Sequence, residues 1–135
     1  MSKRDCTYRC ALITGASSGL GLEFARQLAP SVETLVLVSR REEVLEKVAR
    51  DLVVRFPHLT VKVFASDLSE VTDRGRLIGS LAAEGLRPDL LVNNAGLGDY
   101  GEFLTADWLK TSEMIRLNIE ALTHLTHVFL PGLIT

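Results

Sequence analysis

A glycine-rich segment near the start of the chain, Thr14–Gly21, has the composition of a turn that binds phosphate. Its glycines are spaced G-x-x-x-G-x-G, and it contains no Lys, which excludes a Walker-type phosphate loop. Glycine lets the backbone approach an anion closely, and the start of a following helix offers unpaired N–H groups and partial positive charge. A purely structural turn is the alternative. The pattern predicts that a pyrophosphate binds along Gly15, Ser17, Ser18, Gly19, Leu20 and Gly21, with Gly19 and Gly21 facing it closely.

Two arginines follow the second predicted strand, at the position where NAD(H) sites and NADP(H) sites usually differ. Sites for NAD(H) usually place Asp or Glu after the second strand to hold the free ribose hydroxyls. Here the residues are Ser39, Arg40 and Arg41. A guanidinium binds a 2′-phosphate as a bidentate fork, whereas a carboxylate would repel it. We therefore predict NADP(H) in preference to NAD(H), with Ser39 and Arg40 in the site. For Arg41, a surface charge at a helix start is the alternative.

Apolar runs that alternate with helical patterns predict the elements that position these residues. The runs at 10–13, 34–38, 60–65 and 89–92 predict strands, and the second is continuous, as in a strand buried on both faces. Leu20, Phe24 and Leu28 share one face of a predicted helix at 19–28. The other predicted helices are one capped by Ser39 and Glu42 and ended by Pro57, one at 69–84, and a long one at 107–130 stopped by Pro131-Gly132.

This order predicts an α/β fold, a Rossmann-like, doubly wound parallel sheet with right-handed crossovers. We expect residues 1–135 to form one NAD(P)-binding domain that is incomplete after the fourth strand and the long helix that follows it. Ligands of such sheets bind beyond the carboxyl ends of the strands. The informative loops, at 14–21, 39–41, 66–68 and 93–101, all lie at such ends.

The composition excludes several other classes of protein. The chain has 135 residues, 47% of them apolar, and a net charge of -2, which is ordinary for a globular protein and gives no reason to expect binding to nucleic acid or to an anionic membrane. No apolar run is long enough to span a bilayer or to form a signal peptide. Cys6 and Cys10 do not make a disulfide scaffold. We therefore expect a cytoplasmic protein with no nucleic-acid or membrane partner and no bound metal.

Four motifs stand in order along the chain: the glycine-rich segment, Asp67-Leu68, Asn93–Gly96 and Asn118. Together they resemble the N-terminal, cofactor-binding half of a short-chain dehydrogenase/reductase, and they cover nearly the whole chain. The resemblance implies an NADP(H)-dependent oxidoreductase that reduces a carbonyl or oxidises an alcohol. Arg40 matches the position that marks NADP(H)-preferring members.

The resemblance also implies a role for each of the later motifs. Asp67 and Leu68 would hold the adenine. Asn93, Ala95 and Gly96 would line the cofactor, and the segment that contains them would also brace the sheet. Asn118 would be a catalytic residue whose backbone carbonyl holds a water in a proton relay.

One departure from the family pattern concerns catalysis. The family's chemistry needs a Ser on the next strand and a Tyr-x-x-x-Lys helix, and neither Tyr8 nor Tyr100 has a Lys four residues on. We therefore expect a cofactor-binding portion that is inactive alone, or, as the alternative, a non-catalytic NADP(H)-binding or sensing module. The strand at 89–92 would then be a sheet edge, and the long helix, which packs in a dimer interface in this family, would form a homo-oligomer contact.

Two further groups of residues leave two interpretations open. Glu120, His124 and His127 share a helix face and suit either a metal ion or a polar surface patch. Tyr100 and Phe103 follow the fourth strand, where this family lines its substrate pocket, and they suit either that pocket or a small apolar cluster beneath the loop.

Overall fold

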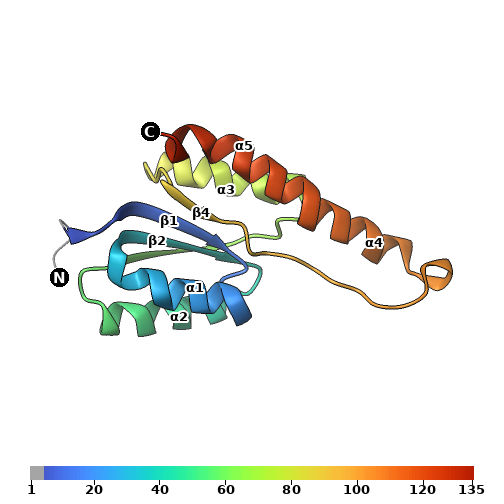
Figure 1. Cartoon of the computed structure of the whole chain (residues 1–135), viewed down its shortest axis with the longest axis horizontal. Coiled ribbons are helices and arrows are strands. Elements are labelled where there is room, and N and C mark those ends of the chain that lie inside the picture. Colours follow the sequence, from blue (N-terminus) through green and yellow to red (C-terminus); the bar gives the residue numbers. More distant parts are fainter. Residues whose placement is uncertain (1–4) are drawn as a thin grey trace.

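The computed structural model describes residues 5–135 and contains a four-stranded parallel sheet with helices on both faces (Figure 1). The strands are β1 (Tyr8–Thr14), β2 (Val32–Ser39), β3 (Thr60–Ala65) and β4 (Leu90–Val92). Their order across the sheet is β3-β2-β1-β4, with every pairing parallel. This is the strand order of the first half of a Rossmann fold, so the predicted doubly wound α/β architecture is confirmed.

The helices divide into two layers. They are α1 (Gly19–Leu28), α2 (Glu42–Arg55), α3 (Val71–Ala83), α4 (Trp108–Ile115) and α5 (Leu122–Leu133), and a π-helical segment (Arg116–Ala121) joins the last two. Helices α1 and α2 cover one face of the sheet, and α3 and α5 cover the other (Figure 1). Helix α4 and the loop before it extend beyond the carboxyl ends of the strands.

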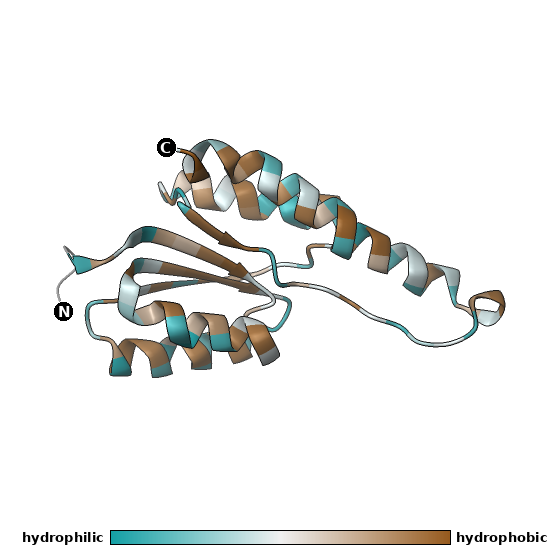
Figure 2. Cartoon of the chain, viewed as in Figure 1, coloured by the Kyte–Doolittle hydropathy of each residue, from teal (hydrophilic) through white to brown (hydrophobic). Residues whose placement is uncertain are grey.

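The core consists of two apolar clusters separated by the sheet. Leu35 and Leu37 of β2 belong to the cluster beneath α1 and α2, whereas Val36 and Val38 belong to the cluster beneath α3 and α5. All four side chains are fully buried, so the prediction of a strand covered on both faces is confirmed. Figure 2 shows the same pattern as hydrophobic strands between layers of mixed helices.

Helix α1 buries a different face from the one the sequence predicts. Leu20 is 74% exposed and Phe24 is 45% exposed, while Gly21 and Ala25 are the buried residues of this helix. Small residues on the inner face let the helix axis lie close to the sheet, which leaves the larger apolar side chains on the outside. The predicted stripe of Leu20, Phe24 and Leu28 is therefore wrong for Leu20 and Phe24, whereas Leu28 packs partly buried against the core.

Two predicted helix ends are also corrected. Helix α2 begins after Arg41, and the Ser39 hydroxyl accepts a hydrogen bond from the Arg41 N–H at 3.1 Å, because β2 extends as far as Ser39 and leaves no room for a capping box with Glu42. Helix α5 continues through Pro131 to Leu133. Proline removes one N–H donor and crowds the carbonyl four residues before it, and the helix ends two residues after Pro131.

The β4 edge of the sheet is unpaired within the described residues, and the outer side of the long helix carries exposed apolar side chains. Strand β4 is an edge strand, as predicted. Along the helix, Ile115, Ile119 and Leu122 are exposed. Among residues 5–135, no helix has both the length and the apolar character needed to cross a membrane.

Candidate functional site

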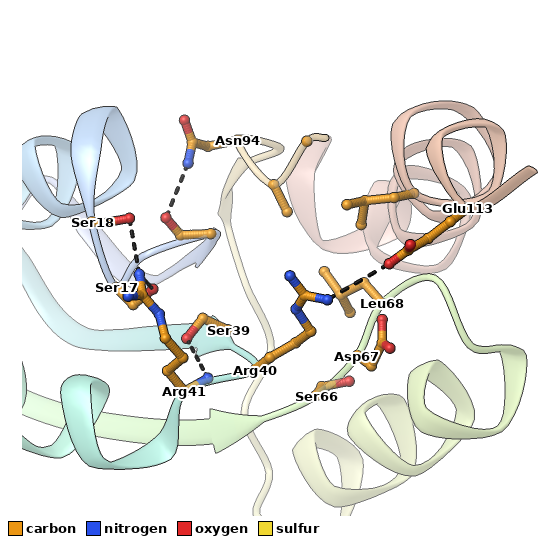
Figure 3. A pocket seen from close by; sticks show the side chains of 14 residues that line it. Ser17, Ser18, Ser39, Arg40, Arg41, Ser66, Asp67, Leu68, Asn94 and Glu113 are labelled. Atoms are coloured by element: carbon orange, nitrogen blue, oxygen red, sulfur yellow. Dashed lines mark hydrogen bonds and ion pairs between the residues drawn. The ribbon is translucent and has the colours of Figure 1, made fainter. Parts of the chain in front are cut away.

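A hollow of about 340 Å³ lies beyond the carboxyl ends of the strands (Figure 3). This is where an open parallel sheet binds its ligands. Most of the residues predicted to bind the cofactor line it: Gly15, Ser17, Ser18, Ser39, Arg40, Asp67, Leu68, Ala95 and Gly96. The other predicted site residues are not among its lining residues: Gly19, Leu20, Gly21, Asn93 and Asn118.

The two later glycines of the turn have different surroundings. Gly19 has φ +57°, and a Cβ built on it meets no heavy atom of the described residues within 4 Å. A Cβ on Gly21 would lie 2.1 Å from the Gly15 carbonyl oxygen. Gly21 therefore permits α1 to pack on the turn rather than facing a ligand, whereas Gly19 leaves open space at the start of the helix.

A hydrogen-bonded clamp joins the glycine turn to the end of β4. The Thr14 hydroxyl oxygen accepts the N–H groups of Asn94 at 3.0 Å and Ala95 at 2.9 Å. In return, the Asn94 side-chain amide donates to the carbonyls of Thr14 and Gly15, both at 3.1 Å. These bonds fix the turn to the neighbouring strand end, so the predicted bracing of the sheet by this segment is present.

Both arginines line the hollow, and their side chains diverge from adjacent positions in the loop after β2 (Figure 3). Arg41 donates through Nη2 to the hydroxyl oxygens of Ser17 at 2.9 Å and Ser18 at 3.1 Å. Arg40 reaches away from the glycine turn and forms an ion pair with Glu113 of α4 at 3.6 Å. Arg41 is thus an exposed residue just before α2 that lines the hollow and bonds to the glycine turn.

The loop after β3 is held in place by its own side chains. Asp67 accepts through Oδ1 from the N–H of Ser69 at 3.1 Å and from its hydroxyl at 2.7 Å. The Asp67 N–H donates to the Asp73 carboxylate at 3.1 Å. These bonds keep the Asp67 backbone in a fixed turn at the side of the hollow.

A buried arginine that sequence reasoning missed supports the same loop. Arg74 is 1% exposed and donates to the Leu68 carbonyl at 2.7 Å. It also donates to His124 Nδ1 at 3.2 Å and pairs with the Glu120 carboxylate. The guanidinium lies between Glu120 and His124, so both side chains bind an arginine. Within residues 5–135, no group of side chains is suited to a metal ion.

The two predicted asparagines do not line the hollow and bond to neighbouring segments instead. Asn118, in the π-helical segment, accepts from the Leu97 N–H at 2.9 Å and donates to the Leu97 carbonyl at 2.8 Å. Asn93 donates to the Thr126 hydroxyl of α5 at 2.9 Å. Asn118 thus fixes the loop after β4, and π-helical turns of this kind are frequent at functional sites.

A second hollow, of about 320 Å³, lies in the loop between β4 and α4. Tyr100 and Phe103 line it, and both side chains are largely exposed. In the described structure, Tyr100 and Phe103 therefore do not form a small apolar cluster beneath the loop.

Two residues that line the main hollow were not predicted from the sequence. They are Glu113 and Leu117, and both come from the long helix. Their only signal in the sequence is that a helix follows the fourth strand. Its passage past the strand ends is a property of the tertiary structure.

The fold and the hollow define a Rossmann-type α/β protein of the kind that binds nucleotides. A family model described as short chain dehydrogenase matches residues 9–135. The chain therefore belongs to the short-chain dehydrogenase family, which the four motifs predicted.

Individual relatives support the same assignment. The chain is 35% identical, over 119 residues, to a very-long-chain 3-oxoacyl-CoA reductase-like protein of Arabidopsis thaliana, covering 86% of this chain and 37% of that protein. It is 36% identical to the short chain dehydrogenase resG of Aspergillus sclerotiorum, covering 99% of this chain and 37% of that protein. The chain thus spans well under half the length of these curated relatives.

Solved structures match across nearly the whole chain. A metagenomic short-chain oxidoreductase in complex with NADP superposes with a TM-score of 0.84 at 35% identity, covering 93% of this chain and 57% of that one. L-sorbose reductase from Gluconobacter frateurii, complexed with NADPH and L-sorbose, gives a TM-score of 0.86 at 30% identity, covering 97% of this chain and 49% of that one.

Proposed function

We propose that this chain forms the NADP(H) site of an oxidoreductase that reduces a carbonyl or oxidises an alcohol. The observation that carries the proposal is the pair of arginines that line the hollow beside the glycine turn, at the end of a strand with no acid. A 2′-phosphate is a favourable partner for such a pair, and the free hydroxyls of NAD(H) are not. Solved relatives in complex with NADP and with NADPH are consistent with this choice.

Each part of the hollow suits one part of the cofactor. The open space at Gly19 and the start of α1 would hold the pyrophosphate. Arg40 and Arg41 would hold the 2′-phosphate, and Asp67 with Leu68 would hold the adenine. Ala95 and Gly96, on the other side of the glycine turn, would lie along the ribose that leads toward the nicotinamide.

The bound cofactor would supply or accept a hydride. Asn118, through its backbone carbonyl, would hold a water of the proton relay, and its two side-chain bonds to Leu97 would keep that carbonyl in place. No Tyr of this sequence has a Lys four residues on. We therefore propose that these residues bind cofactor without turning over substrate by themselves, and the same observation favours a non-catalytic NADP(H)-binding module as a second candidate.

Further proposals concern the whole protein and its surroundings. The substrate of the complete protein would be a small-molecule carbonyl or alcohol compound, in line with relatives named as very-long-chain 3-oxoacyl-CoA reductase and L-sorbose reductase. The long helix would form a homo-oligomer contact through Ile115, Ile119 and Leu122, which are exposed. Cys10 is a buried cysteine that forms no disulfide, which is in line with a reducing compartment such as the cytoplasm.

Calorimetric titration with NADPH and NADH tests the proposal. A charge-assisted contact to a 2′-phosphate contributes about 1.5–3 kcal/mol, which corresponds to about a 10- to 100-fold preference for NADPH. Arg40→Ala should remove most of that preference. Arg26→Ala, which removes an exposed arginine paired with Glu23 on α1, should leave it unchanged. Equal affinities for the two cofactors in the unaltered chain would contradict the proposal.

A second arm of the experiment addresses turnover. The purified chain is mixed with NADPH and a panel of ketones and aldehydes, and absorbance of the reduced nicotinamide is followed. We expect no oxidation above background. Protein-dependent oxidation that is lost on Asn118→Ala would show that the catalytic apparatus lies within these 135 residues.

A further inference from the structure

An ion pair between Arg40 and Glu113 lies across the hollow, and the proposed binding of the cofactor does not require it. Arg40, from the loop after β2, pairs with Glu113 of α4 at 3.6 Å. Both residues line the hollow, and Figure 3 shows the arginine reaching across it toward the helix, beside Leu68. The pair therefore connects two elements that lie more than seventy positions apart in sequence, through the space in which a ligand would bind.

The partners of the two arginines differ in charge. Arg41 is held by the neutral hydroxyls of Ser17 and Ser18. Arg40 is held by a carboxylate, which competes with a phosphate for the same guanidinium because each presents two anionic oxygens that can accept its paired N–H donors. An incoming 2′-phosphate would meet Arg41 without an anionic competitor, but it would have to displace Glu113 from Arg40.

We propose that Glu113 is a specificity-determining residue that competes with the 2′-phosphate for Arg40 and so lowers the preference for NADP(H). This inference rests on the proposed function of the hollow as an NADP(H) site. Glu113 holds Arg40 across the hollow when the cofactor is absent. Binding of the 2′-phosphate moves the guanidinium from the α4 carboxylate to the cofactor.

The exposure of the pair bounds the size of the effect. The Arg40 side chain is 64% exposed and that of Glu113 is 31% exposed, so solvent screens their attraction. Exposed ion pairs of this kind change an equilibrium by at most about fivefold. Salt screens the competition further, so the effect is largest at low ionic strength.

Four variants of the chain separate this competition from simple repulsion between Glu113 and a phosphate. Calorimetry at low salt measures NADPH and NADH binding to the unaltered chain, Glu113→Gln, Arg40→Ala and the double variant. We expect Glu113→Gln to tighten NADPH about two- to fivefold and to leave NADH unchanged. In the Arg40→Ala background, Glu113→Gln should not change the affinity for NADPH, because the guanidinium for which Glu113 and the phosphate compete has been removed.

A control removes a paired carboxylate elsewhere that is 42% exposed, against 31% for Glu113. Glu84 pairs with Lys62 at 3.1 Å, and neither residue lines the hollow. Glu84→Gln should therefore leave NADPH binding unchanged. Circular dichroism of each variant confirms that the fold is retained.

Three results would overturn the inference. Equal tightening by Glu113→Gln with and without Arg40 would show direct repulsion of the phosphate. Unchanged or weaker NADPH binding by Glu113→Gln, while Arg40→Ala still weakens NADPH, would refute the competition and leave the cofactor site standing. Failure of the unaltered chain to bind NADPH would remove the proposed function and this inference with it.

Discussion

Gly19 provides a test of the pyrophosphate site because its substitution separates the ligand from the fold. Its φ of +57° lies in the left-handed region, and a Cβ there would meet nothing within 4 Å among the described residues. The cost of Gly19→Ala to stability is therefore only that of an L-residue in this conformation, about 1–2 kcal/mol. For a chain of this size that corresponds to a fall in Tm of roughly 3–6 °C.

The same substitution should have a larger effect on cofactor binding. The new methyl group points into the open space where we propose that the pyrophosphate binds. Loss of one charge-assisted hydrogen bond from a backbone N–H costs about 1.5–3 kcal/mol, so NADPH should bind at least about tenfold more weakly. A fluorescence titration of NADPH, together with a thermal melt followed by circular dichroism, measures both effects on one sample.

Gly21→Ala serves as the contrasting variant. Its Cβ would lie 2.1 Å from the Gly15 carbonyl oxygen, so the turn and helix α1 must move apart. Overpacking against backbone costs about 1–3 kcal/mol or more, and the loss of Tm should exceed that of Gly19→Ala. The reasoning is refuted if Gly19→Ala binds NADPH as tightly as the unaltered chain, or if it is the less stable of the two variants.

Two further predictions concern buried groups away from the cofactor. Arg74→Met should lower the free energy of unfolding by about 3 kcal/mol, because it leaves the partners of a buried charge unpaired, with the half-exposed Glu120 keeping the loss at the lower end. Urea denaturation measures this, and a change below 1 kcal/mol would contradict the role given to Arg74. Burial, assisted by the negative charge of Asp89, raises the pKa of the Cys10 thiol from 9.0 to about 11. The unfolded thiol therefore ionises at a lower pH than the folded one, and stability should fall between pH 9 and 11 by about 1–3 kcal/mol; a Cys10→Ala variant with the same decline would refute this cause.

The strands could be predicted because a strand that is buried in the sheet is a short run of apolar residues in the sequence. The continuous apolar run of β2 requires cover on both faces, and α1 and α2 on one side with α3 and α5 on the other provide it. The face of α1 was not predictable in this way. Hydrophobic periodicity identified Leu20 and Phe24, but the close approach allowed by Gly21 and Ala25 decided which side is buried.

The residues in and beside the hollow differ in the same way, because some are placed by the local sequence and others only by tertiary contacts. Those that directly follow a strand, such as Ser17, Arg40 and Asp67, could be placed from the sequence because the carboxyl ends of parallel strands meet at one edge. Glu113, which lines the hollow, and Arg74, which supports the loop beside it, could not be placed. Their contacts join elements 46 to 73 positions apart, and they depend on how the long helix returns over the sheet.

The central claim is that the hollow binds the adenosine 2′-phosphate end of NADP(H). Backbone amide NMR of the labelled chain during titration with 2′,5′-ADP, and separately with 5′-AMP, tests it most directly. We predict that 2′,5′-ADP changes the amide chemical shifts of residues 15–19, 40–41 and 67–68 together. We predict that 5′-AMP leaves the amide chemical shifts of residues 40 and 41 unchanged. Shifts confined to other parts of the chain, or equal responses of Arg40 and Arg41 to both ligands, would contradict the account.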